Sequence, residues 1–247
     1  IVGIVIGAGI FKTPSLVAAL SGDAGWALVL WVTGALISIV GALCYGELCT
    51  AYPHAGGDYH FLHRAFGRNI SFIYGWSRAI IINTGSIALL AFVFGDYIST
   101  LVSLGTYSSV IWALLVVVLL TAVNLAGIHA SSRMQTWLTL TEIVGLLAVV
   151  AAGFWVDAPA SGTLQWFAQA PAPAQWGLSL VFVLLTFGGW NEAAYISAEL
   201  KGGPHTMVRV ILASMLTLTV IYLLVNTALL FGLGLNGLSQ SKTAAGD

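Results

Sequence analysis

The chain has 247 residues, of which 59% are hydrophobic and only 7% are charged. A typical soluble domain has about 25% charged residues, so this composition excludes a water-soluble globular protein, which would lack the polar side chains needed to cover its surface. The formal net charge of −1 indicates no particular charged partner.

Uncharged apolar stretches of about 20 residues recur along the chain, and each can cross a hydrocarbon core of roughly 30 Å as an α-helix. We therefore predict an all-α membrane protein with about seven transmembrane helices. Helices are favoured because a lipid-facing backbone must satisfy its own hydrogen bonds, and the alternating pattern of a membrane barrel is absent. In chain order, the predicted spans cover residues 1–20, 26–51, 70–98, 110–130, 134–156, 176–200 and 207–233.

The basic residues of the loops predict the orientation of these spans. They follow the second, fourth and sixth spans, at Arg64, Arg68, Arg133, Lys201 and Arg209. The intervening loops contain Asp23, Asp96 and Asp157 and no Lys or Arg. By the positive-inside rule the basic loops are cytoplasmic, so the first span runs outward and the loop 157–175 is external. Residues 56–67 are expected to form a short amphipathic helix on the cytoplasmic surface.

Two of the predicted spans contain clustered glycines where a membrane helix should be continuous. The first span includes Gly3-Ile4-Val5-Ile6-Gly7-Ala8-Gly9-Ile10-Phe11, and the sixth includes Thr186-Phe187-Gly188-Gly189-Trp190-Asn191. Each interior Gly costs about 1 kcal/mol relative to Ala in a helix. We therefore predict that the backbone opens at residues 7–10 and 187–190, and that the two openings lie close together near mid-membrane.

An opened helix presents free N–H groups at the start of its second half and free carbonyls at the end of its first half. The N–H groups suit a carboxylate and the carbonyls suit an ammonium, so paired breaks can hold a zwitterion without a charged side chain. The breaks lie five spans apart, as an inverted repeat of five helices predicts. The alternative is that these glycines mediate close helix packing, because Gly3 and Gly7 fit the small-xxx-small pattern.

The sequence resembles the amino acid, polyamine and organocation (APC) permease superfamily, most closely its bacterial amino-acid permeases akin to L-type amino-acid transporters. The resemblance rests on three motifs: Gly7-Ala8-Gly9-Ile10-Phe11, then Ala51-Tyr52-Pro53-His54-Ala55-Gly56-Gly57-Asp58-Tyr59, then Phe187-Gly188-Gly189-Trp190-Asn191-Glu192. It implies a LeuT-like fold of two inverted five-helix repeats. Residues 1–156 would form the first repeat, 157–175 an external loop, and 176–247 the incomplete start of the second. We accordingly expect an N-terminal fragment of a longer transporter.

The resemblance also implies a substrate site. The substrate carboxylate would meet the backbone N–H groups of Ala8 and Gly9, and the ammonium would meet the carbonyls of Val5, Leu185 and Gly188. Trp190 adjoins the second break and is expected to line the pocket. The full set of expected substrate-binding residues is Val5, Gly7, Ala8, Gly9, Ile10, Leu185, Phe187, Gly188, Gly189, Trp190 and Asn191.

The sequence departs from the family pattern at three positions. Ala8 replaces a Ser that is often found between the two glycines, so one hydroxyl contact is lost. Leu185 occupies the position of an aromatic gate in L-type relatives. Glu142 lies in the fifth span where many relatives have a Lys linked to proton coupling, which leaves the coupling mechanism open.

Charged residues within spans are costly, at about 2.5 to 3.5 kcal/mol near the membrane centre. Glu142, Glu192 and Arg78 should therefore face the interior of the bundle or water. Glu142 and Glu192 are the candidate coupling residues, which would bind a proton or pair with another ion. The alternative for all three is a buried structural pair or a neutral carboxyl.

These observations predict a secondary active transporter that moves amino acids across the cell (inner) membrane by alternating access. A polyamine or cationic amino-acid transporter of the same fold is the alternative, since Glu192 lies near the second break. An ion channel would need rings of charge or carbonyls from several subunits, and no filter-like segment is evident. An enzyme would need a catalytic cluster such as HExxH or GxSxG, and neither occurs. The expected partners are an amino acid, protons as a candidate coupling ion, and lipid. No nucleic acid, cofactor or metal is expected, and the oligomeric state is left open.

Overall fold

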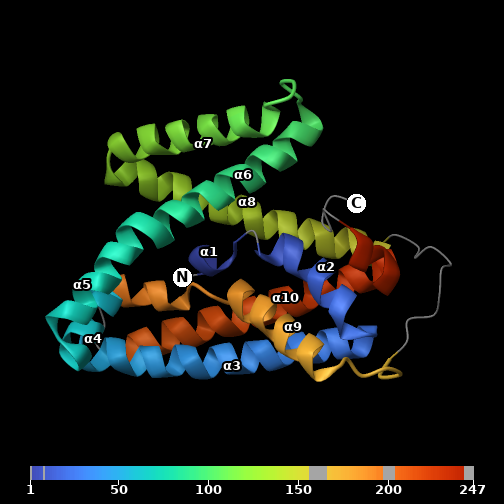
Figure 1. Ribbon diagram of the computed structural model, residues 1–247, viewed down its shortest axis with the longest axis horizontal. Coiled ribbons are helices and arrows are strands. Elements are labelled where there is room, and N and C mark those ends of the chain that lie inside the picture. Colours follow the sequence, from blue (N-terminus) through green and yellow to red (C-terminus); the bar gives the residue numbers. More distant parts are fainter. Residues whose placement is uncertain (1, 8, 156–165, 197–203, 242–247) are drawn as a thin grey trace. The chain divides into compact units, whose positions relative to one another are not determined.

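The computed structural model describes residues 2–7, 9–155, 166–196 and 204–241 (Figure 1), and within these ranges all regular secondary structure is helical. The elements are α1 (Val2–Val5), α2 (Gly9–Ser21), α3 (Ala24–Ala51), α4 (Gly57–Phe66), α5 (Arg68–Ser77), the π-helix η1 (Arg78–Ile82), α6 (Asn83–Leu101), α7 (Ser108–Leu125), α8 (Ile128–Trp155), α9 (Pro173–Thr186), the 3₁₀ helix η2 (Trp190–Ile196) and α10 (Pro204–Gln240). The predicted all-α fold class is confirmed.

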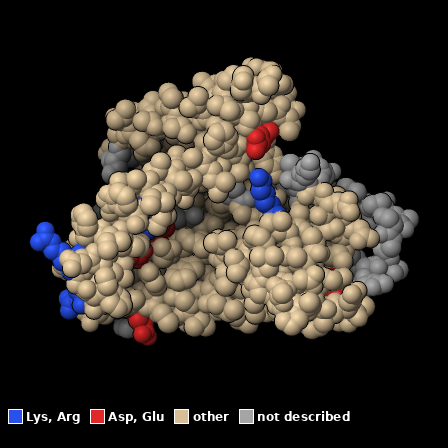
Figure 2. Space-filling model, viewed as in Figure 1, with Lys and Arg blue, Asp and Glu red and all other residues tan. Residues whose placement is uncertain are grey.

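Six helical segments in the described part of the chain are long and apolar enough to cross a membrane. They are Ala24–Ala51, Arg68–Leu101, Ser108–Leu125, Ser131–Trp155, Pro173–Tyr195 and Thr206–Gln240. The first predicted span is not among them, because it is divided into α1 and the 13-residue α2. Figure 2 shows that charged side chains form only small separate patches on the face in view, as expected for a multi-pass membrane protein.

The fourth predicted span differs from the observed helix. It was expected to cover residues 110–130, whereas α7 ends at Leu125 and residues 128–130 belong to α8. The cause is Gly127, whose φ of 114° ends the helical path and lets the chain start a new helix at once. A left-handed glycine is a common helix terminator that hydropathy alone does not reveal. The predicted amphipathic helix at 56–67 is confirmed as α4.

The chain divides into two compact units, which we describe separately: Ile1–Gly57 with Thr139–Asp247, and Asp58–Leu138. In the first unit α3 runs beside α9 and α10, and α2 packs on both of these helices (Figure 1). Close approach depends on small residues in α3, because a Cβ at Gly34 would collide with Val183 of α9. The close-packing role weighed for Gly3 and Gly7 is met at Gly3, where a Cβ would collide with the Thr139 side chain, but not at Gly7, where a Cβ would meet nothing within 4 Å.

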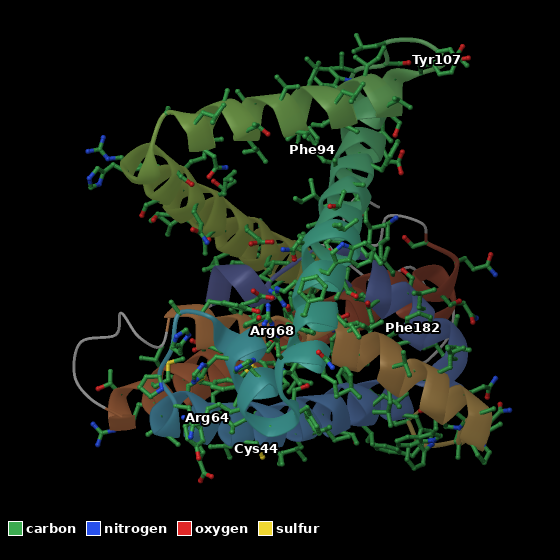
Figure 3. All side chains as sticks on the ribbon, turned by 60° about the vertical axis from the view of Figure 1, so that its left-hand side comes forward. Cys44, Arg64, Arg68, Phe94, Tyr107 and Phe182 are labelled. Atoms are coloured by element: carbon green, nitrogen blue, oxygen red, sulfur yellow. The ribbon has the colours of Figure 1, made fainter. Side chains whose placement is uncertain are left out.

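The second unit contains the hairpin of α6 and α7 and the segment of α4, α5 and η1. Arg64 in α4 and Arg68 at the start of α5 lie on successive helices of this unit (Figure 3). Arg78, the cation predicted to need an interior partner, donates from Nη1 to the Tyr74 hydroxyl at 3.0 Å and lies 3.7 Å from Asp58 Oδ2. The Tyr74 hydroxyl in turn donates to Asp58 Oδ2 at 2.6 Å. Arg78 therefore takes part in a structural ion pair, as the alternative interpretation held.

Candidate functional site

The helix of the first span is interrupted near its glycines. α1 ends at Val5, Ile6 and Gly7 lie outside regular structure, and α2 begins at Gly9. The predicted interruption is therefore present but shorter than expected, since Gly9 and Ile10 already belong to α2 and the Ile10 N–H reaches the Gly7 carbonyl at 3.4 Å. Ala8, the expected partner of Gly9 in carboxylate binding, lies outside the described residues.

The helix of the sixth span is interrupted at its glycine pair. α9 ends at Thr186, residues 187–189 form a turn, and the 3₁₀ helix η2 begins at Trp190. The turn is closed by hydrogen bonds from the Phe187 N–H to the Val183 carbonyl at 2.9 Å and from the Gly188 N–H to the Leu185 carbonyl at 3.2 Å. Gly189 has a φ of 98°, which only glycine adopts without strain. Continuous α-helical hydrogen bonding therefore stops at this point.

The two interruptions lie against each other. A Cβ built at Gly9 would lie 3.0 Å from Thr186 Oγ1 and 3.3 Å from Thr186 Cα, so the first turn of α2 contacts the last turn of α9. Thr13 Oγ1 and Thr186 Oγ1 are 2.7 Å apart and buried. Because the Thr186 hydroxyl donates to the carbonyl of Phe182 at 2.9 Å, Thr13 is the donor in this pair. The positive end of one helix dipole thus meets the negative end of another.

Tyr222 of α10 occupies the space between the two breaks, and our sequence reasoning missed it. Its side chain is fully buried, and its hydroxyl lies 3.2 Å from the Val5 carbonyl and 3.4 Å from the Thr186 carbonyl. The hydroxyl has one proton, so it donates to one carbonyl at a time. The last carbonyls of α1 and α9 therefore share one donor. A tyrosine inside a membrane span was the available signal, because a buried hydroxyl needs a partner.

Aromatic rings surround this tyrosine. The Phe187 ring centroid lies 5.0 Å from that of Tyr222, and the Trp31 ring of α3 lies 5.9 Å from Tyr222 and 6.0 Å from Phe187. Phe187, an expected site residue, is fully buried in this cluster. The structure thereby gathers Val5, Gly9 and Phe187 around residues that sequence reasoning did not single out.

The remaining expected site residues have other surroundings than the aromatic cluster around Tyr222. The Leu185 side chain is 72% exposed and outside the aromatic cluster. Trp190 is half-buried and packs edge-on against Tyr45 of α3, with ring centroids 5.1 Å apart, and over Gly41. Asn191 continues from Trp190 into η2 and is half-buried. Gly7 in the first break has open space where a Cβ would stand.

The candidate coupling residues occupy separate places. Glu142 is half-buried on α8, three residues after Thr139, whose side chain packs against Gly3 of α1. Glu192 is half-buried in the first turn of η2, where its backbone N–H donates to the Gly189 carbonyl at 3.0 Å. Glu142 is thus associated with the first break and Glu192 with the second.

The chain is similar in sequence to known amino acid transporters and exchangers. The profile of one protein family, described as amino acid permease, matches residues 1–246. The serine/threonine exchanger SteT of Bacillus subtilis is 28% identical over 99% of this chain and 57% of its own length. The human Asc-type amino acid transporter 1 is 29% identical over 99% of this chain and 49% of its own length. The b(0,+)-type amino acid transporter 1 of Rattus norvegicus is 28% identical over 99% and 52%. The chain therefore spans about half the length of these curated relatives.

Proposed function

Because the chain belongs to the amino acid permease family, we propose that the complete protein is a secondary active transporter that moves amino acids across the cell membrane by alternating access. The substrate carboxylate binds the backbone N–H groups of Ala8 and of Gly9, the first residue of α2. The ammonium binds carbonyls at the ends of α1 and α9, those of Val5, Leu185 and Gly188. What carries the proposal is the contact of Gly9 with Thr186, which joins a helix N-terminus to a helix C-terminus at the two breaks.

The meeting of a helix N-terminus with a helix C-terminus at the two breaks supports a zwitterionic ligand in particular. Free N–H groups at the start of a helix favour anions, and free carbonyls at its end favour cations. The Val5 carbonyl shares the Tyr222 hydroxyl with the Thr186 carbonyl, and the Leu185 carbonyl accepts a hydrogen bond from the Gly188 N–H. A carbonyl oxygen has two lone pairs, so each can accept a second bond from an ammonium group. The names of the relatives, which are transporters or exchangers of amino acids, support the same substrate class.

The proposal is tested by uptake into proteoliposomes that contain the full-length protein. Radiolabelled L-serine, L-leucine, L-arginine and putrescine should be offered separately, with and without an opposing amino acid inside and with and without a pH gradient. Uptake of a neutral amino acid but not of putrescine is expected. Putrescine uptake without amino acid uptake would instead favour the cationic alternative, which rests on Glu192 beside the second break. Uptake of none of these compounds by active, folded protein would contradict both.

We further propose that Glu142 takes up a proton during transport. The half-buried carboxyl of Glu142 lies on α8 three residues after Thr139, which packs against Gly3 of α1, so it is placed to link protonation to the helix that precedes the first break. We expect Glu142→Gln to retain exchange of substrate for substrate but to lose the dependence of net uptake on the pH gradient, because the amide cannot exchange a proton. The measurement compares both modes in the same proteoliposomes. Gradient-driven uptake equal to the parent's would assign Glu142 a structural role only.

A further inference from the structure

Asp23 lies in the turn between α2 and α3 and is only 1% exposed. It is the N-cap of α3, and its Oδ1 accepts a hydrogen bond from the Trp26 N–H at 2.9 Å. An N-cap aspartate usually stands in solvent, since its role needs only one local bond. Here a segment 146 residues later in the chain covers it, and Oδ2 accepts from the Gln169 N–H at 3.1 Å. One carboxylate thus joins two distant parts of the first unit.

The covering segment, residues 167–169, turns its backbone toward the Asp23 carboxylate. Phe167 has a φ of 60°, a conformation that side chains rarely adopt, and the turn directs successive backbone N–H groups at the carboxylate. The Phe167 ring packs on Gly25 and edge-on against Trp26, with centroids 5.5 Å apart. On the other side of the contact, a Cβ at Gly22 would lie 2.6 Å from the Gln169 carbonyl oxygen, so the backbones approach at a glycine.

The carboxylate remains charged at neutral pH. Burial acts to raise the pKa of Asp23, but hydrogen bonds from the backbone N–H groups of Trp26, Gln169, Phe167 and Ala168 act to lower it, and the net pKa lies below its usual range. A depressed carboxyl pKa means that the ionised form stabilises the fold at every pH above the ordinary value of about 3.9, and that this stabilisation is lost only as the pH falls through the lowered pKa. The contact is therefore intact under physiological conditions.

The contact at Asp23 connects α2 and α9, the two helices that border the breaks. The covering segment leads through Ala172 into α9, whose first turn carries Trp176 against Trp26, with ring centroids 5.7 Å apart. The far end of α9 is Thr186, which is bonded to Thr13 of α2. α2 and α9 are thus joined near the breaks through the threonines and joined again, at the opposite ends, through Asp23.

We propose that Asp23 is a positioning residue for substrate binding. By tying residues 167–169 to the α2–α3 turn, it holds the N-terminus of α2 and the C-terminus of α9 at a fixed position relative to each other. This inference rests on the proposed function, because it assigns these two helix ends to the halves of one substrate. Both halves of the site then move as one body. A loosened outer end lets α9 shift along or about α2, which displaces the carbonyls that receive the ammonium from the N–H groups that receive the carboxylate.

The test separates the two bonds of Asp23. Asp23→Ser keeps an N-cap that can accept from the Trp26 N–H, because Ser caps helices about as well as Asp. Its single short hydroxyl cannot also reach the Gln169 N–H. The matched control is Gln175→Ala, which removes the bond from the Ala172 N–H to Gln175 Oε1, 2.9 Å long, in the same segment without touching α2 or α3. Affinity for the amino acid taken up by the parent is measured on purified, folded full-length protein.

We expect Asp23→Ser to lower the affinity about fivefold and Gln175→Ala to leave it within about twofold of the parent. Unchanged affinity in Asp23→Ser with a lowered thermal midpoint would make Asp23 a purely structural cap and overturn the proposal. An equal loss in both variants would also overturn it, because general disorder of the loop would then be the cause. A parent that binds none of the amino acids offered would overturn the proposed function itself, a result distinct from either.

Discussion

Replacement of Gly9 by Val in the full-length protein is expected to lower amino acid affinity by about 100-fold while membrane insertion is retained. A Cβ at this position would lie 3.0 Å from Thr186 Oγ1, 3.2 Å from Cγ2 and 3.3 Å from the backbone Cα. The two further methyl groups of Val must therefore push α2 and α9 apart. Overpacking of this kind costs about 1–3 kcal/mol, and each 1.4 kcal/mol is a tenfold change in affinity.

Gly177→Val is the matched control for this experiment. Gly177 belongs to α9 as well, but a Cβ there meets nothing within 4 Å. The same chemical change should thus leave affinity within about twofold of the parent's. Binding is measured on purified protein, with insertion followed by membrane fractionation. If Gly9→Val bound substrate as tightly as Gly177→Val, the contact between the two breaks would not be part of the binding site.

Tyr222→Phe is expected to lower affinity about tenfold and to lower the thermal midpoint. The change keeps the ring that packs against Phe187 and Trp31 and removes only the hydroxyl. That hydroxyl is the shared donor of the Val5 and Thr186 carbonyls, so its loss leaves a buried acceptor without its bond. An unsatisfied buried polar group costs about 1–3 kcal/mol, and the ends of α1 and α9 lose the group that holds them together.

Tyr107→Phe provides the control for loss of a tyrosine hydroxyl. Tyr107 directly precedes α7 (Figure 3). Its side chain is 72% exposed, so removal of its hydroxyl breaks no buried hydrogen bond and costs little. Affinity and thermal midpoint should both match the parent's. The contrary result would be parental affinity in Tyr222→Phe at a lowered midpoint. Tyr222 would then stabilise the helix packing without shaping the site.

The breaks themselves were predictable because their causes are local. Glycine clusters raise the cost of a continuous helix at residues 3–9 and 188–189 whatever the rest of the chain does. Their exact extent was less predictable. Gly9 and Ile10 belong to α2. Only residues whose backbone cannot continue the helical hydrogen bonding stay outside a helix, and a new helical turn can begin directly after them.

The number of predicted spans between two loops has one structural test in the first unit. The positive-inside rule placed both the Asp23 turn and the loop 157–175 outside the membrane. The bond between Asp23 and Gln169 requires that these two segments lie on the same side, as predicted. Four predicted spans separate the two segments, so the count of spans alone places them on one side, and the choice of the outer side stays a prediction from the Lys and Arg residues.

By itself the sequence determined the all-α membrane class, the order of the spans and the two interruptions, because hydropathy and glycine content act over about 20 residues or fewer. Only the tertiary structure decided which groups meet at the interruptions. Thr13 and Thr186 are 173 residues apart in the chain, Tyr222 and Val5 are 217 apart, and Asp23 and Gln169 are 146 apart. A hydroxyl or carboxylate within an apolar span or turn must find a partner, but nothing local to it specifies which distant backbone group the packing of helices will bring within reach.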